Sequence, residues 1–322
     1  MDLHQRTLRI GLTVILFSAV IRLFSGLPPV SDRPPKIIEA ADTETGQSVR
    51  FPSFFGSFSP EFGESAAPLA REPEIPCFSG AAIPEIRNGT KTHPDLQDLL
   101  LQPLTWDLEG MDPTVLILHT HATESYAQSK DHPYRQTAAY RTLDEGFNML
   151  FIGDAVAELL VQKGISVIHD RTLHDYPSYN GSYSSSRKAV EAYLQEYPSI
   201  QLILDLHRDA SEGSTQLRTL AHVEGKRSAQ LMVVIGAGHK GYTENLALGL
   251  KLHAQLETQS PGITRPLQLR SQRFNQDLLP GTLLIEVGAA GNSHEEALQA
   301  AAQLARAVAA LAQGTRIPAE DG

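Results

Sequence analysis

Three apolar runs along the chain each end in side chains that can carry out chemistry. They are residues 115–121, which end in His119 and His121, residues 201–207, which end in His207, and residues 281–286, which end in Glu286. Uninterrupted runs of Val, Leu and Ile are typical of strands buried on both faces, and open α/β sheets place their sites at the carboxyl ends of such strands. The pattern therefore predicts that the three strand ends meet at one site.

Segments with apolar residues at helical spacing alternate with these runs. The predicted helices are residues 144–163, 185–196, 243–259 and 293–312, and further strands are predicted at residues 165–168, 230–235 and 267–273, the last as an antiparallel edge strand. Thr142 with Glu145, and Ser293 with Glu296, have capping-box spacing at the start of the first and last helix.

Strands that alternate with helices imply right-handed crossovers and a largely parallel sheet. We therefore predict a single doubly wound α/β domain over residues 111–314, with a mostly parallel sheet and helices on both faces. Residues 315–322 form a short tail after it.

The amino-terminal end has the pattern of a membrane-targeting segment. Residues 10–21 carry no charge, and His4, Arg6 and Arg9 precede them. Basic residues before an apolar segment predict a signal anchor or a signal peptide over residues 1–27, with an amphipathic or cytosolic helix as the alternative. The expected location is the cell membrane, with a single span and the catalytic domain on the extracytoplasmic side. Residues 28–110, rich in Pro, Ser and Gly, are predicted to be a disordered spacer.

Composition restricts the function classes. A net charge of −10 and a pI near 5.6 argue against general nucleic-acid binding, which needs a basic surface. Cys77 is the only cysteine, which excludes an intramolecular disulfide and a thiolate-rich zinc site. Any metal in this chain would therefore be held by histidine and carboxylate.

The strand ends contain the ligand types of a catalytic zinc site. His121 and Glu124 have His-x-x-Glu spacing, and His207 would supply a third ligand, which leaves the fourth position open for water. Glu286 lies inside an apolar run, where an unpaired carboxylate is costly, and it suits the role of general base. The alternative for each histidine is an ordinary hydrogen-bonded residue at a strand end.

Four motifs carry a resemblance to a known family. They are HTHATESY at 119–126, HDRTLHDYPSYN at 169–180, LDLHRDA at 204–210 and LIEVG at 284–288. Over residues 111–312 the chain resembles the stage II sporulation protein P family, membrane-anchored cell-wall hydrolases of endospore-forming bacteria related to the zinc-dependent N-acetylmuramoyl-L-alanine amidases.

The resemblance implies hydrolysis of the amide between N-acetylmuramic acid and L-alanine in peptidoglycan, and also of peptide cross-links. It implies Zn²⁺ as cofactor, and sporulation proteins D and M as partners during engulfment of the forespore. His121 and His207 match the zinc histidines of the amidases, and Glu286 matches their catalytic glutamate. The carboxylate ligand has two main candidates, because local spacing favours Glu124 whereas the amidases use a glutamate that opens the first helix, here Glu145, and Asp144 ranks third. A capping-box role for Glu145 and a supporting role beside a histidine for Glu124 are the alternatives.

Residues around these positions are candidates for substrate contact. Arg208 could pair with a carboxylate of the stem peptide or with Asp209. The loop that holds Tyr176, Tyr179 and Asn180 suits a glycan or a peptide, although an ordinary surface loop is the equal alternative. His119 is expected to support the site from its edge or to be a buried structural histidine.

Two other functions are compatible with the same residues. A zinc carboxypeptidase-like hydrolase also uses a His-x-x-Glu pair, a distant histidine and a late glutamate. A catalytically silent scaffold that binds the cell wall would keep the fold without turnover. An arginine that closes the pocket around a free carboxylate would favour the carboxypeptidase, and an open groove would favour the amidase.

Overall fold

A computed structural model describes residues 78, 81–104, 106–108, 110–130, 132–211 and 216–314, together with the backbone of residues 36–38. The predicted anchor at 1–27, most of the predicted spacer and the tail at 315–322 lie outside these residues. Within the described part of the chain, no helix has both the length and the apolar character needed to cross a bilayer.

An eight-stranded sheet forms the centre of the fold, in the order β1-β4-β3-β5-β10-β8-β9-β2. The strands of this sheet are β1 (Lys36–Ile38), β2 (Ile86–Asn88), β3 (Val115–Leu118), β4 (Val167–His169), β5 (Leu202–Asp209), β8 (Leu231–Gly236), β9 (Leu267–Arg270) and β10 (Thr282–Ala289). A separate hairpin joins β6 (Ala221–Val223) and β7 (Lys226–Ser228).

The sheet is mostly parallel, as predicted. β4, β3, β5 and β10 run parallel to one another, and the direction reverses between β10 and β8. β9 was predicted to be an antiparallel edge strand, but it is parallel to β8 and β2 pairs with its other side. The prediction was wrong because the strand direction reverses between β10 and β8, before β9 is reached, and because β2 was not expected.

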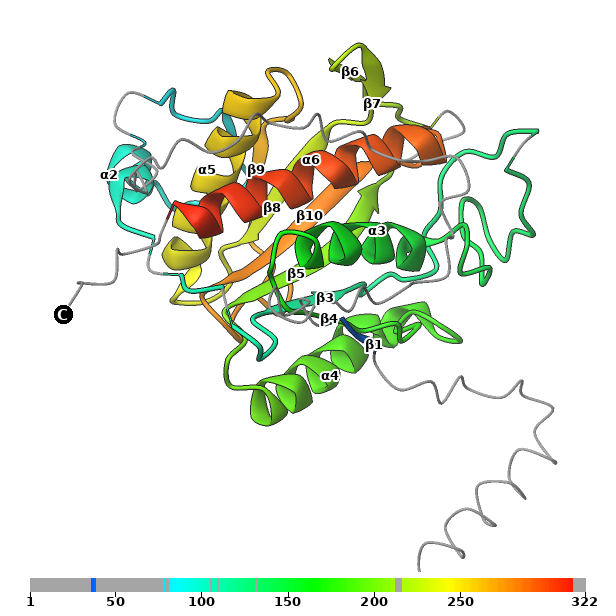
Figure 1. The fold of residues 1–322 in the computed structure, drawn as a ribbon, viewed down its shortest axis with the longest axis horizontal. Coiled ribbons are helices and arrows are strands. Elements are labelled where there is room, and N and C mark those ends of the chain that lie inside the picture. The colour runs from blue at the N-terminus through cyan, green and yellow to red at the C-terminus, as the bar shows by residue number, and fades with distance from the viewer. Residues whose placement is uncertain are drawn as a thin grey trace, which may run out of the picture. The chain divides into compact units, whose positions relative to one another are not determined.

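Helices cover the two faces of the sheet unequally. The helices are α2 (Leu96–Leu101), α3 (Met149–Val161), α4 (Ser182–Glu196), α5 (Tyr242–Gln259) and α6 (His294–Gln313), with a single 3-10 turn, η1 (Tyr179–Gly181). Residues of α2, α3, α5 and α6 share one large core with the strands, and α3, α6 and α5 lie side by side in Figure 1. On the opposite face, α4 packs over Leu116 and Ile203.

The opposite face is different over β10, β8 and β9. Side chains alternate between the two faces of a strand, and Leu284, Met232 and Val234 point away from the large core. Their small cluster is joined only by Phe274, from the loop after β9, and by no helix of the described residues. Helices therefore lie on both faces, as predicted, but half of one face is left without a helical cover.

The first helix begins later than predicted. α3 starts at Met149, and its N-cap is Asn148, whose side chain accepts a hydrogen bond from the Leu150 amide. The hydroxyl of Thr142 instead donates to the Arg135 carbonyl, so Thr142 and Glu145 do not form the predicted capping box. The capping box of Ser293 and Glu296 at the start of α6 is present, as predicted.

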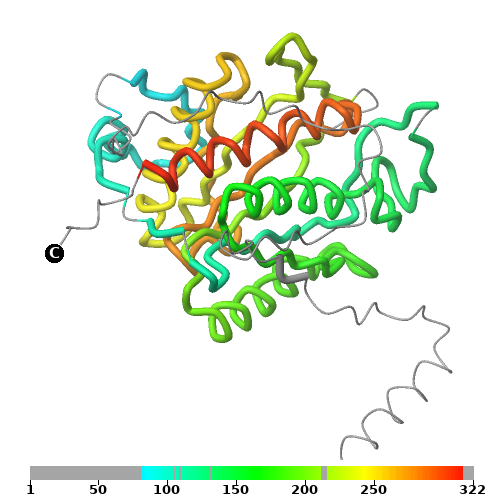
Figure 2. The backbone as a smooth tube through the Cα atoms, in the orientation of Figure 1, coloured from blue at the N-terminus to red at the C-terminus, as the bar shows by residue number. Residues whose placement is uncertain are grey.

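The folded domain also begins earlier than predicted, because residues 81–108 are not a disordered spacer. β2 pairs with β9, and α2 packs on α5, as the cyan and yellow stretches of Figure 2 show. Leu100 is fully buried and Leu108 nearly so, and Lys251 of α5 donates a 2.8 Å hydrogen bond to the Leu99 carbonyl. Elements this short have too few residues to show a period, which is why composition alone assigned them to the spacer.

Candidate functional site

A cleft of about 420 Å³ opens where the predicted strand ends meet the uncovered half of the sheet. The predicted site residues that line it are His121, Glu124, Tyr179, His207, Arg208 and Glu286. Glu286 lies directly beside His207 in the register of β10 and β5. The structure thus brings together the ends of the three apolar runs.

Two histidines and one glutamate form the centre of the cleft. The His121 and His207 rings pack edge to face with centroids 5.2 Å apart, and His207 Nδ1 lies 3.7 Å from Glu124 Oε2. Glu124 is 6% exposed, and it accepts hydrogen bonds from the Arg141 side chain and the Arg208 backbone amide, each of 3.2 Å. Burial opposes its charge, but Arg208 and His207 outweigh burial and hold the pKa of Glu124 far below its ordinary value.

Asp205 is a site residue that sequence reasoning missed. Its Oδ1 lies 3.0 Å from His207 Nε2, and the backbone amide and hydroxyl of Thr120 donate to its two oxygens. Burial opposes the charge of Asp205, but His207 outweighs it and lowers the pKa to about 2. Burial likewise opposes the charge of His207, but Asp205 and Glu124 raise its pKa well above the ordinary value. The clue in the sequence was a carboxylate inside an apolar strand, two residues before His207 and so on the same face.

Glu286 is a partly buried acid whose Oε2 atom is shielded from solvent. Its environment removes it from water and raises its pKa to about 8, and burial is the largest cause. Its Oε2 atom has no hydrogen-bond partner among the described residues. A buried carboxyl oxygen without a partner is expensive, so the fold keeps this atom at a cost in stability.

The residue types fit a zinc ion, but their atoms do not form a completed coordination shell. His121 Nδ1 is buried without a hydrogen-bond partner in the described part of the chain, and an unpaired imidazole nitrogen in a cleft that also holds a carboxylate suits Zn²⁺. Nevertheless, no group of three His, Cys, Asp or Glu residues among those described converges closely enough to hold a metal ion. Glu124 is instead turned toward Arg141 and Arg208.

Aromatic side chains flank His121. The Tyr179 ring stacks on His121 with the ring centroids 4.5 Å apart and an angle of 13° between the planes. The Arg141 guanidinium lies 4.8 Å from the centre of the Tyr179 ring. Tyr183, on α4, meets His121 edge-on at 5.6 Å. Tyr176 and Asn180 are exposed and are not among the residues that line the cleft.

The Arg208 side chain forms its hydrogen bonds within the protein. It is 5% exposed, and its guanidinium donates to the carbonyls of Ser125 and Tyr140 at 3.0 and 2.9 Å. The expected alternative, a salt bridge with Asp209, is wrong because Asp209 pairs with Arg265 at 2.7 Å. Arg208 therefore fixes the loop that carries Glu124.

His119 and Glu145 lie away from the cleft. His119 is fully buried and contacts the Leu206 carbonyl and His169. Glu145 forms a 2.7 Å ion pair with Arg171 and does not line the cleft. Because α3 begins at Met149, Glu145 does not open the first helix, and that was the basis for treating it as an alternative ligand.

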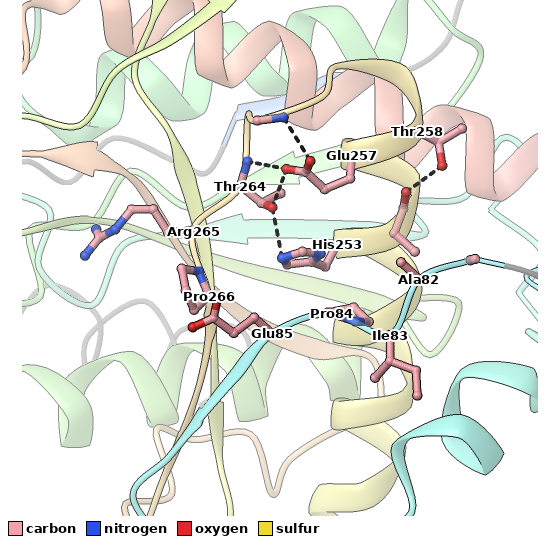
Figure 3. Close-up of a pocket in the computed structure, with 13 residues that line it drawn as sticks. Ala82, Ile83, Pro84, Glu85, His253, Glu257, Thr258, Thr264, Arg265 and Pro266 are labelled. Carbon is pink, nitrogen blue, oxygen red and sulfur yellow. Dashed lines mark hydrogen bonds between the residues drawn. The ribbon is translucent and has the colours of Figure 1, made fainter.

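A second hollow of about 430 Å³ lies between residues 81–85, the end of α5 and residues 262–266 (Figure 3). Its polar groups pair with one another. Thr264 donates a 2.5 Å hydrogen bond to Glu257, and His253 Nε2 lies 2.9 Å from the Thr264 hydroxyl. None of the residues that line it has a buried side-chain atom without a partner among the described residues. The cleft with unpaired histidine and glutamate atoms is therefore the candidate site.

Fold and site together define an α/β protein that gathers histidines and carboxylates beside the carboxyl ends of its central strands. Residues 71–309 match the family model of Stage II sporulation protein P, and the chain belongs to that family.

A curated relative is Stage II sporulation protein P of Bacillus subtilis (strain 168), which is 30% identical over 210 residues. The match covers 60% of this chain and spans about half, 49%, of the relative.

Solved structures similar to this chain include two N-acetylmuramoyl-L-alanine amidases. The enzyme from Clostridium difficile 630 has 17% identity and a TM-score of 0.39, and the match covers 63% of this chain and 94% of that one. AmiC2 of Nostoc punctiforme has 14% identity and a TM-score of 0.36, with the same coverage of 63% and 94%.

Proposed function

We propose that this chain is a peptidoglycan hydrolase of sporulation that cleaves the amide between N-acetylmuramic acid and L-alanine, with peptide cross-links as a second target. The observation that carries the proposal is the meeting of His121, Glu124, His207 and Glu286 in one cleft. Membership of the Stage II sporulation protein P family supports the role in sporulation.

Zinc is part of the proposal. His121, Glu124 and His207 would hold the ion, which when bound lowers the pKa of water and polarises a carbonyl oxygen. Asp205 faces His207 Nε2 at 3.0 Å, which is the arrangement in which a carboxylate orients a ligand histidine. His207 would then turn its Nδ1 atom, on the side of Glu124, to the ion.

Glu286 would handle the proton. Its carboxyl group lines the cleft, and its raised pKa lets the same group accept a proton and release it near neutral pH. The proton held there would pass to the nitrogen of the leaving amide. Tyr179, exposed beside His121, can contact the substrate with its ring edge and its hydroxyl group, because His121 and Arg141 lie over its ring.

Cellular context is also proposed. The apolar segment within residues 1–27 would anchor the protein in the cell membrane with the domain on the extracytoplasmic side. Sporulation proteins D and M would be its partners, and nucleic acid would not.

Mass spectrometry of muropeptides after digestion of purified peptidoglycan tests the reaction. The zinc-loaded chain is expected to release stem peptides that begin at L-alanine, and His207→Ala is expected to release none while remaining folded. Loss of the terminal residue alone would favour the zinc carboxypeptidase-like alternative. Binding to peptidoglycan without any product would favour the silent scaffold. Normal product release by His207→Ala would contradict the metal site.

A further inference from the structure

The uncovered half of the sheet forms a continuous floor that leads away from Glu286. In the register of the strands, Glu286 lies beside Met232, and Leu284 lies beside Val234. Val234 in turn lies beside Gln268 on β9. These side chains share one face of the sheet and line the same cleft, so the floor is apolar in the middle and polar at its far side.

Arg270 lies at the far end of this floor. It is two residues beyond Gln268 on β9, and it lines the cleft. From Glu286 the path crosses two strand spacings and four residues of strand length, about 16 Å between Cα atoms. An extended peptide covers that distance with about four or five residues.

Arg270 differs from the other arginines near the cleft in having no anionic partner. Arg265 pairs with Asp209, and Arg187 and Arg273 both contact Asp277. For Arg270, which is exposed, no carboxylate lies within ion-pair distance among the described residues. Arg208, which was expected to receive a substrate carboxylate, is committed to backbone carbonyls. A free guanidinium at the end of the groove is therefore available for an anion.

We propose that the helix-free face of β10, β8 and β9 binds the peptide part of the substrate in an extended form, and that Arg270 receives a peptide carboxylate. The proposal rests on the proposed function, because it assigns the peptide side of the same cleft. Small apolar side chains fit the floor of Leu284, Met232 and Val234, and a guanidinium binds a planar carboxylate through two parallel hydrogen bonds.

The test uses two soluble muropeptides that differ in one group. Both carry a disaccharide and a four-residue stem, and one ends in a carboxylate whereas the other ends in a carboxamide. With the zinc-loaded chain, kcat/KM is expected to be about tenfold higher for the carboxylate, mainly through KM. Arg270→Gln should remove this preference, and Arg270→Lys should restore part of it.

Arg273→Gln is the matched control, because Arg273 is an exposed arginine three residues after Arg270 and does not line the cleft. It should keep the tenfold preference. A wild-type chain that cleaves both muropeptides equally, or Arg270→Gln that keeps the preference, would overturn the proposal for Arg270.

Binding of both muropeptides to the Glu286→Gln chain, measured by calorimetry, distinguishes a failure of the Arg270 subsite from a failure of the proposed function. Tighter binding of the carboxylate form that disappears with Arg270→Gln supports the subsite whether or not turnover occurs. Absence of turnover of either muropeptide by the wild-type chain, with carboxylate-dependent binding intact, contradicts the proposed function and leaves the subsite standing. Turnover without any carboxylate dependence of binding contradicts the subsite alone.

Discussion

His119 and His169 face each other behind the cleft with their Nε2 atoms 2.9 Å apart. His119 Nδ1 lies 2.9 Å from the Leu206 carbonyl, which can only accept, so Nδ1 carries the hydrogen. Burial, followed by the neighbouring His169, lowers the pKa of His119 to about 3, and the ring is neutral. Its Nε2 atom must therefore accept a hydrogen from His169 Nε2.

The histidine pair continues into a chain of polar contacts. His169 Nδ1 lies 3.1 Å from Asp154, and Asp154 pairs with Arg171. A Cβ atom at Gly153 would lie 2.4 Å from the Nε2 atoms of both histidines, so only glycine allows α3 to pack this closely. The chain joins β3, β4 and α3 to the carbonyl of the residue before His207.

Substitution of His169 should show the strength of this pair. His169→Gln keeps an amide N–H that can donate to His119, and we expect it to lower the free energy of unfolding by about 1 kcal/mol. His169→Ala leaves the buried His119 Nε2 without a donor and should cost about 3 kcal/mol. Chemical denaturation of both variants measures the difference. Equal loss in the two variants would mean that the hydrogen bond contributes nothing.

The lowered pKa of His119 predicts a pH dependence of stability. The folded protein keeps His119 neutral down to about pH 3, whereas the unfolded chain binds a proton below its ordinary pKa of 6.5. The stability from this residue is fully present above pH 6.5 and is lost as pH falls, by about 2 kcal/mol at pH 5. His119→Asn keeps a donor for the Leu206 carbonyl and should remove that part of the slope. Denaturation of both metal-free proteins at pH 7 and pH 5 checks it, and identical slopes would contradict it.

Truncation should distinguish the observed domain start from the predicted one. A chain that begins at residue 81 retains β2 and α2 and loses, among the described strands and helices, only the three-residue edge strand β1, so its denaturation midpoint should lie close to that of the full-length chain. A chain that begins at residue 111 loses the buried side chains of Leu99, Leu100 and Leu108, and with them on the order of 5 kcal/mol of stability. Equal midpoints for the two truncated chains would show that residues 81–110 do not contribute to the stability of the domain.

The sequence was most informative where apolar runs were long. β3, β5 and β10 follow such runs, and their ends meet in the cleft. The existence of β2 could not be predicted, because three residues are too few to show a period. The direction of β9 could not be predicted, because the apolar pattern of one strand does not give the direction of its neighbours. His119 and His121 have the same sequence signature, and only the packing of α3 and β4 separates a buried structural pair from a cleft residue.

Glu286 should be needed for catalysis and not for zinc binding. Glu286→Gln keeps the shape of the side chain but cannot accept a proton, so kcat should fall by about 10²-fold or more. Zinc content, measured by mass spectrometry of metals, should stay at the wild-type level because Glu286 is not a proposed ligand. Activity within a few-fold of wild type would remove Glu286 from the proposed role.

Zinc affinity tests whether Glu124 or Glu145 is the carboxylate ligand, which the sequence left open. Glu124 lies 3.7 Å from His207 and lines the cleft, whereas Glu145 is paired with Arg171 outside it. Glu124→Gln should therefore weaken zinc binding by about 100-fold or more, since it removes a charged ligand. Glu145→Gln, an equal change in charge, should leave the affinity within about twofold and lower stability only slightly, because its ion pair is partly exposed. Competition against a chromophoric chelator measures the zinc affinity of both variants. A larger loss of affinity in Glu145→Gln than in Glu124→Gln would assign the ligand to Glu145. It would also require α3 to extend toward residue 145 when the ion is bound.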